Sequence, residues 1–247
     1  SEVSREAADL ILLDDNFTTI VDTVKDGRRI YDNIRKAVGY VFAIHIPIAF
    51  ASLLAPLLGI APSALLLLPL HIVLLELIID PTCSLVLERQ PAESDIMDRP
   101  PRNPKENIVN TGTLAKSIFQ GLFIFAASFG TYFLTLDGNP ENAPLARTMG
   151  LSIIMLSNLF LVQVNSSDHD FAFQSAVRLA KDKIMWAINL ITLAGLCVIL
   201  YTPLSTFLKL APLPADRFFI CLGVAAVSVL WYEIVKLIKM LKSRHSN

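Results

Sequence analysis

Two carboxylates and a proline interrupt an apolar stretch of the chain. Glu76 and Asp80 lie in the run LELIIDPTCS, residues 75–84, and Pro81 follows directly. An i, i+4 spacing places both acids on one face of a helix. An ionisable group in the middle of a membrane costs at least about 2.5–3.5 kcal/mol, and such groups usually face a bundle interior and serve ions or protons. We therefore interpret the pair as part of an intramembrane cation site.

The two acids also predict a role for protons. Repulsion between neighbouring carboxylates and the loss of hydration both favour the protonated forms. At least one of Glu76 and Asp80 should therefore carry a proton when no cation is bound, and a site that exchanges protons for a cation follows. The alternative is a carboxyl pair that neighbouring helices satisfy without any ligand.

Two prolines should add backbone oxygen atoms to this region. Pro81 removes the hydrogen bond to the carbonyl of Leu77, and Pro47 removes the one to the carbonyl of Ala43. Hard cations prefer oxygen ligands, and irregular backbone at membrane depth is tolerated where it lines an enclosed site. Both carbonyls are therefore candidate ligands.

Further polar side chains lie within apolar segments. His45, in AIHIPIAF, is interpreted as a ligand, a proton carrier or a counter-ion to one of the acids, or else as a core histidine hydrogen-bonded across helices. Asn158 is central in its segment and could supply an amide oxygen or an interhelical hydrogen bond. His71, one to two turns before Glu76, is interpreted as a satisfied polar contact.

The elements that must position these residues are membrane spans. The chain is 53% hydrophobic and 17% charged, whereas soluble domains are nearer 45–50% apolar and about 25% charged. A hydrocarbon core needs about 20 apolar residues as helix. Six segments qualify: 38–58, 64–87, 115–136, 147–165, 184–206 and 216–238.

The distribution of basic residues predicts the orientation of these spans. The short connection 59–63 predicts an antiparallel hairpin, and of 21 Lys and Arg only Arg147, Lys209 and Arg217 fall in connections on that side. The other side should be cytoplasmic and should hold both termini. A net charge of -1 gives no basis for binding nucleic acid.

The first 37 residues differ from the rest. Residues 10–13 could form a short buried strand, closed by a turn at 14–16. Residues 21–40 predict an amphipathic helix that runs without a break into the first span, and such a helix could act as a mechanical rod. The alternative is a basic juxtamembrane helix held by anionic lipid.

Three stretches resemble the P-type cation-transporting ATPases. EAADLILLDDNFTTIVDTVKDGRRIYDNIRK is similar to the segment that leaves the phosphorylation domain and enters the fifth membrane helix of that family. ELIIDPTCSLVLERQPAESDIMDRPPR resembles the sixth helix and following loop of the type II group, which includes calcium and sodium/potassium pumps. RTMGLSIIMLSNLFLVQVNSS is similar to the eighth helix. The resemblance implies that the six spans are helices five to ten of a ten-helix pump.

This resemblance implies an all-α membrane bundle after a remnant of an α/β, HAD-like cytoplasmic domain. The expected division is a phosphorylation-domain tail, a stalk helix, a six-span transport domain and a cytoplasmic tail, at 1–27, 28–40, 38–240 and 241–247. The DKTGT motif, the nucleotide and actuator domains and the first four helices are absent from the sequence. We therefore expect this chain alone to be inactive as an ATPase.

The resemblance also assigns roles to the polar residues. Asp80 matches the sixth-helix ion-binding aspartate, and Glu76 matches a position that is asparagine or aspartate in the family. His45 matches a fifth-helix asparagine ligand, and Asn158 matches an eighth-helix acid. The fourth membrane helix of the family supplies carbonyls and a further acid.

Two positions depart from the family pattern. Ile48 replaces the fifth-helix glutamate ligand, and Ile79 replaces a threonine or other polar ligand. The loss of these oxygen atoms argues against a two-calcium site and favours a single ion, with proton countertransport.

The expected function is therefore the membrane transport part of an ATP-driven pump for calcium or another hard cation. Its expected partners are the transported cation, the lipid bilayer and the N-terminal remainder of the pump, which would bind ATP and Mg²⁺. Short loops favour a multi-pass protein of a bacterial plasma membrane. The alternatives are a secondary, proton-coupled cation transporter and a non-catalytic membrane module.

Overall fold

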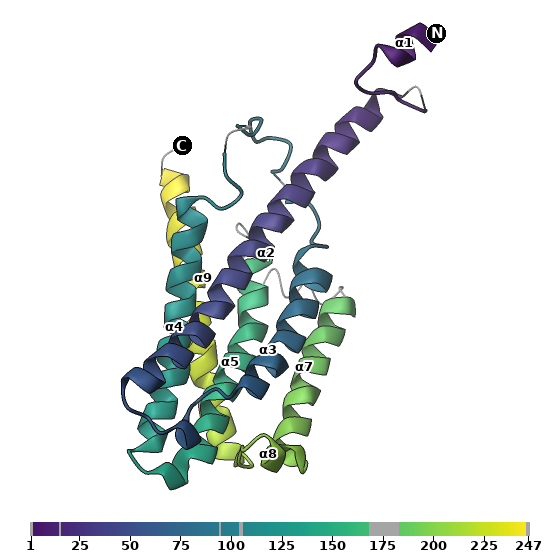
Figure 1. The fold of residues 1–247 in the computed structure, drawn as a ribbon. Coiled ribbons are helices and arrows are strands. Elements are labelled where there is room, and N and C mark those ends of the chain that lie inside the picture. The colour runs from purple at the N-terminus through teal and green to yellow at the C-terminus, as the bar shows by residue number, and fades with distance from the viewer. Residues whose placement is uncertain (1, 15, 94, 104–105, 168–182, 246–247) are drawn as a thin grey trace.

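A computed structural model describes residues 2–14, 16–93, 95–103, 106–167 and 183–245. These residues form helices and contain no strand (Figure 1). In chain order the elements are α1 (Glu2–Glu6), α2 (Thr18–Leu57), the 3₁₀ helix η1 (Pro62–Ala64), α3 (Pro69–Thr82), the π-helical turn η2 (Cys83–Leu87), α4 (Thr111–Leu136), the 3₁₀ helix η3 (Pro140–Asn142), α5 (Ala143–Asn165), α7 (Lys183–Tyr201), α8 (Leu204–Phe207) and α9 (Ala215–His245).

Six of these helical stretches are long and apolar enough to cross a membrane, which confirms an all-α, multi-pass bundle. The two ends of the chain lie at the same end of this bundle (Figure 1). Three predicted boundaries differ from the structure: the third and fourth spans begin four residues earlier, at Thr111 and Ala143, and the fifth ends at Tyr201 rather than at residue 206. Pro203 follows two residues later and cannot continue the hydrogen-bonded ladder.

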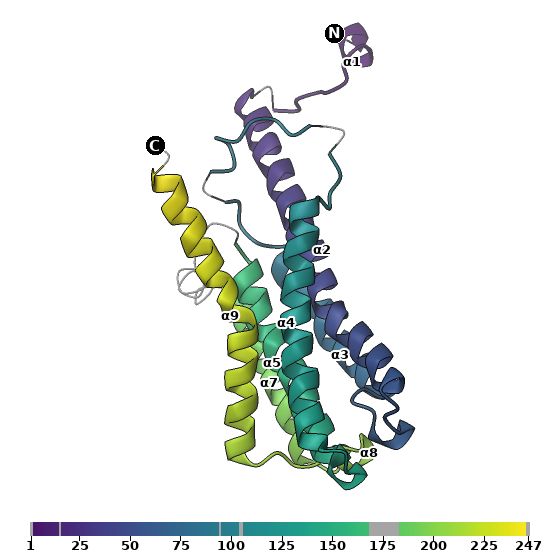
Figure 2. The ribbon, with the colours of Figure 1, turned by 90° about the vertical axis from the view of Figure 1, so that its left-hand side faces the viewer.

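Helix α2 is continuous over 40 residues, as the amphipathic pattern predicted. Its start is marked by Asn16, whose side chain accepts a hydrogen bond of 3.1 Å from the backbone N–H of Thr18. A helix of this length spans about 60 Å. The N-terminal part of α2 therefore projects well beyond the other spans (Figures 1 and 2).

Helix α5 is the centre of the bundle. In its apolar window 83% of the residues are buried, against 28–44% for the other five spans. In Figure 2, α4 and α9 cover α5, and α2 and α7 also contact it. Because α5 is enclosed on most sides, its polar side chains must find partners within the bundle.

The contact between α2 and α4 depends on a glycine. A Cβ atom placed on Gly121 would lie 2.6 Å from the Cβ of Ile46 and 2.7 Å from the carbonyl oxygen of Ala43. Small residues allow membrane helices to approach this closely. Gly121 therefore fixes where α2 and α4 touch.

The predicted strand near the N-terminus is wrong for this chain. Residues 10–13 have no regular structure, and Leu10 and Leu13 are 65% and 91% exposed. A single strand needs neighbours to pair with, and none of the described residues supplies one. Asp15, in the predicted turn, lies outside the described residues. The assignment of residues 1–27 to a phosphorylation domain stays a prediction.

The opposite end of the bundle is held by Arg147, near the start of α5. Its buried guanidinium group donates to three backbone carbonyls, those of Leu65 at 2.8 Å, Ser63 at 2.8 Å and Lys209 at 2.6 Å. These carbonyls belong to the α2–α3 and α8–α9 connections. The sequence offered Arg147 only as one charge in the orientation count, and its clamping role is visible only in the structure.

Candidate intramembrane cation site

The structure brings His45 of α2 and Glu76 of α3 into contact. The His45 Nε2 atom lies 3.1 Å from Oε1 of Glu76, and the two side chains are 43% and 35% exposed. The other ring nitrogen, Nδ1, lies 2.8 Å from the carbonyl oxygen of Val41. A polar contact between these two side chains therefore joins α2 and α3 within their membrane spans.

The hydrogen bond of His45 to the backbone fixes the tautomer of its ring. A carbonyl oxygen can only accept, so Nδ1 must donate to Val41. Nε2 is then the ring atom that faces the carboxyl group of Glu76.

Asp80 lies one turn beyond Glu76 on α3 and is exposed. The buried positions of this helix are His71, Leu75, Ile79 and Thr82, of which the apolar Leu75 and Ile79 are each 2% exposed. Because the apolar side chains occupy the face toward α5, the two acids lie on the outer surface of the six-span bundle rather than in its interior. The described part of the chain therefore does not enclose them.

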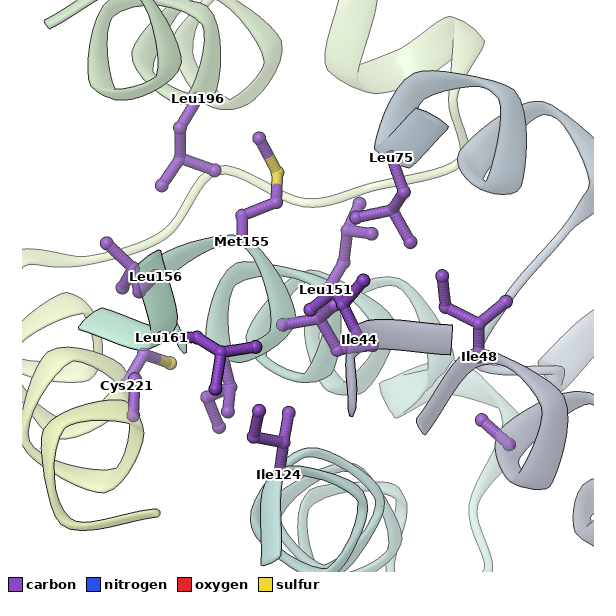
Figure 3. Close-up of a cluster of buried hydrophobic side chains, with 14 of the residues drawn as sticks. Ile44, Ile48, Leu75, Ile124, Leu151, Met155, Leu156, Leu161, Leu196 and Cys221 are labelled. Carbon is purple, nitrogen blue, oxygen red and sulfur yellow. The ribbon is translucent and has the colours of Figure 1, made fainter. Parts of the chain in front are cut away.

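The two positions at which the sequence lacks family ligands are filled by core side chains. Ile48 lies in the apolar cluster with Ile44, Leu75 and Leu151 (Figure 3). Ile79 belongs to the same cluster. The inner side of the α2–α3 contact is therefore apolar at these two positions, with no side-chain oxygen there.

Asn158 does not reach the surface where the acids lie. It is buried in α5, and its Oδ1 atom accepts a short hydrogen bond from the hydroxyl of Tyr40. The hydroxyl of Thr82 on α3 lies next to that of Tyr40. Among the described residues the Nδ2 group of Asn158 has no hydrogen-bond partner. Tyr40, which the sequence analysis did not single out, therefore connects α2 to both α5 and α3.

The predicted backbone ligands differ in their surroundings. The carbonyl of Ala43 faces Gly121 of α4, at the close helix contact. The side chain of Leu77 is 67% exposed, on the outer side of α3. After Pro81 the helix continues as the π-helical turn η2, a widening that often marks functional segments. The π-helical turn thus begins three residues beyond Asp80, while α3 itself continues through Pro81.

His71 is a satisfied buried contact, as predicted. Its Nδ1 atom accepts from the backbone N–H of Leu68 at 3.2 Å, and its Nε2 atom lies 2.8 Å from the carbonyl of Leu208. Within the described residues no three His, Cys, Asp or Glu side chains form a group that could hold a metal ion. Near Asp80, the contact between polar side chains that the structure shows is thus the one between His45 and Glu76.

The projecting part of α2 is fastened to the segment that follows α3. Asn33 donates to the carbonyls of Glu88 and Gln90 at 3.1 and 2.7 Å. Lys36 forms a buried ion pair of 2.5 Å with Glu93. No sequence pattern linked these residues, because their partners are more than 50 positions away. A displacement of α2 would therefore be shared with the end of α3.

Comparison with known proteins agrees with this architecture. A family model described as "Cation transporting ATPase, C-terminus" matches residues 64–238, well over half of the chain. The chain belongs to this family. It is thus a C-terminal membrane region of a P-type cation ATPase, with the helical hairpins and apolar spans described above.

Individual relatives of this cation ATPase region are pumps of different ions. A calcium-transporting ATPase from Bacillus subtilis (strain 168) is 29% identical over 227 residues, which cover 92% of this chain and 25% of that protein. Sodium/potassium-transporting ATPase alpha subunits from Homo sapiens (alpha-4) and Hydra vulgaris are 42% and 40% identical over 144 residues, 56% of this chain and 13% of theirs. The chain therefore spans a quarter or less of these relatives.

Proposed function

We propose that this chain forms the membrane transport part of an ATP-driven cation pump, and that Glu76, Asp80 and His45 belong to its cation site. The observation that carries the proposal is the His45–Glu76 contact between α2 and α3, one turn from Asp80. Three ionisable groups at one level of two spans are costly unless they serve an ion or a proton.

The acids lie on an outer face, and we propose that this face is completed by helices beyond this chain. The relatives are at least four times longer than the aligned segment, and the family resemblance assigns four further helices to the N-terminal side. Asn158 is proposed as a ligand through its amide oxygen, which would require the Tyr40 hydroxyl to turn away. The carbonyls of Ala43 and Leu77 remain candidate oxygen ligands under the same proposal.

The contact between His45 and Glu76 supports proton countertransport. An imidazole and a carboxyl group that lie 3.1 Å apart can each carry a proton. A cation that binds to Glu76 and Asp80 competes with protons for the carboxylate oxygens. Cation uptake would therefore be coupled to proton release.

The apolar packing of Ile48 and Ile79 supports a single-ion site. Each additional hard cation needs its own set of oxygen ligands, and these two positions carry none. We propose one ion per cycle, calcium-like in its preference for oxygen. The ATP and Mg²⁺ that drive such a pump would bind to domains outside this chain, which should be inactive alone.

We further propose that both chain ends face the cytoplasm, since Lys and Arg are concentrated on that side. The membrane proposed is a bacterial plasma membrane. The continuous helix α2 would then connect cytoplasmic domains to His45.

The test is Asp80→Asn in the intact protein. The amide keeps the size of the carboxyl group but removes its charge, so cation-stimulated phosphoenzyme formation should fall to the level seen without cation. The matched control is Asp137→Asn, at the exposed C-terminal end of α4, where φ is +46° and asparagine is well tolerated. This control should leave the cation dependence unchanged. Wild-type cation dependence in Asp80→Asn would remove Asp80 from the site.

A further inference from the structure

A pocket of about 700 Å³ lies between the projecting part of α2 and the segment 96–106, outside the candidate cation site. Four arginines line it, two from each side: Arg28, Arg35, Arg99 and Arg102. The carboxylates in its lining are those of Asp32 and Glu106. Cationic side chains therefore outnumber the acids around this cavity.

The acids neutralise the arginines unequally. Arg99 forms ion pairs with Asp32 at 2.7 Å and with Asp95 at 2.6 Å, and the hydrogen bonds that it donates to Asp95, with the charge of Asp32, raise the pKa of this guanidinium group. One cation in the pocket is thus fully paired. Among the described residues, Glu106 forms no ion pair with any arginine of the pocket.

In the part of the chain that the structure describes, the other three arginines form no ion pair. Arg28 donates to the backbone carbonyls of Ile96 and Arg99, both at 2.8 Å. Arg35 makes one long hydrogen bond of 3.3 Å to the Thr113 hydroxyl. The Arg102 guanidinium group stacks on the ring of Tyr31, 4.2 Å from its centroid. As far as the described residues show, these guanidinium groups therefore retain N–H donors that could bind an anion.

Tyr31, in the wall of the pocket, has an unsatisfied polar atom. Its hydroxyl group is buried and has no hydrogen-bond partner among the described residues. A buried, unsatisfied polar group costs about 1–3 kcal/mol. Arg102 covers the Tyr31 ring, so a movement of Arg102 toward a bound acceptor would also let the acceptor satisfy this hydroxyl.

We propose that this pocket binds a phosphate-bearing anion through Arg28, Arg35, Arg102 and the Tyr31 hydroxyl. Planar guanidinium groups match phosphate oxygens in paired hydrogen bonds, which makes arginine well suited to this anion. Arg35 lies less than one turn before the apolar part of α2 begins at about residue 38. The phosphate could therefore belong to the headgroup of an anionic lipid or to a soluble ion, which share this chemistry.

The experiment measures binding to the intact protein and does not depend on transport. Inorganic phosphate is titrated into the detergent-purified protein by calorimetry. In parallel, the protein is placed in phosphatidylcholine nanodiscs that also contain phosphatidic acid. Native mass spectrometry then counts the phosphatidic acid molecules that the protein retains. The variants are Arg35→Gln, Arg102→Gln and Tyr31→Phe. The control is Arg89→Gln, which removes an exposed charge between α3 and the pocket segment without lining the pocket.

Loss of one charged hydrogen-bond donor should weaken binding of the phosphate probe at least about tenfold. Arg35→Gln and Arg102→Gln should each show this loss. Tyr31→Phe should show a smaller one, and Arg89→Gln none. Selective retention of phosphatidic acid identifies a lipid headgroup, and binding of inorganic phosphate alone identifies a soluble ligand. The proposal is overturned if neither probe binds, or if Arg89→Gln weakens binding as much as the pocket variants do.

Discussion

At the scale of single residues, the polar side chains in the spans differ in how completely they are satisfied. His45 uses both ring nitrogens, with Val41 and with Glu76. Asn158 uses its oxygen with Tyr40, while its Nδ2 group has no partner in the part of the chain that the structure describes. An incompletely satisfied amide in the centre of a bundle is a costly feature. Asn158 lies on α5, which contacts α3, the helix that carries the acids.

The Tyr40–Asn158 contact gives a prediction about stability. Tyr40→Phe removes the donor and leaves the Asn158 oxygen buried without a partner, so the free energy of unfolding should fall by about 1–3 kcal/mol. Asn158→Leu in the same background removes the stranded amide and should restore most of this loss. Thermal unfolding in detergent would measure both variants. If the double variant is less stable than Tyr40→Phe alone, the hydrogen bond is not the source of the effect.

Sequence reasoning reached part of this site. Glu76, Asp80 and His45 were identifiable because ionisable side chains in apolar runs are rare, and the contact between His45 and Glu76 was among the alternatives considered. The partner of Asn158 was not identifiable, because a tyrosine in an apolar helix gives no signal of what its hydroxyl contacts. The outward position of the acids was also missed, since periodicity does not show which face of α3 packs on α5.

At the scale of helices, the α2–α4 contact depends on the absence of a side chain. The backbone of α4 at Gly121 lies against Ile46 and Ala43. Gly130 belongs to the same helix, but no atom lies within 4 Å of the position that its Cβ would occupy. The two glycines therefore form a natural pair for testing close packing.

Gly121→Ala should destabilise the protein by about 1–3 kcal/mol, because the new methyl group would overlap the backbone and Ile46 of α2. Gly130→Ala has space for its methyl group, and alanine is the better helix former, so it should be neutral or slightly stabilising. Thermal unfolding of the two variants in the same detergent makes the comparison. Equal melting temperatures would show that α2 and α4 do not pack this closely.

The helices were largely predictable, because long apolar runs and the amphipathic pattern at residues 21–40 are strong local signals. The spans differ from the predicted ranges mainly at their ends. The residues 10–13 were misjudged, since a short apolar run predicts burial only where neighbouring strands exist. The central place of α5 was not predictable from its hydropathy, which resembles that of the other spans.

At the scale of the whole molecule, one side chain joins three separate parts of the chain. Arg147 connects the start of α5 to the α2–α3 turn and to the segment before α9. The α2–α3 hairpin, which carries the candidate site, is thereby attached to the helix at the centre of the bundle.

Arg147→Gln should lower the stability, since a shorter side chain cannot reach all three carbonyls and each net hydrogen bond from a charged group contributes about 1.5–3 kcal/mol. Arg217→Gln is the control: Arg217 is exposed, and its carboxylate partner Asp216 lies at 3.7 Å. The melting temperature of the intact protein should fall clearly in the first variant and stay constant in the second. A similar melting temperature in both would mean that Arg147 does not hold the two connections.

The close contact of Gly121 on α4 with Ala43 and Ile46 on α2 has a mechanical consequence. It provides a fulcrum at Ala43 and Ile46, which flank His45, whereas the N-terminal end of the helix is a lever arm of roughly 40 Å. A swing at Thr18, as far as the contacts of Asn33 and Lys36 allow it, would therefore move His45 much less than it moves Thr18 and would mainly tilt the imidazole. Such a geometry converts a large, weak push far away into a small, forceful reorientation beside Glu76.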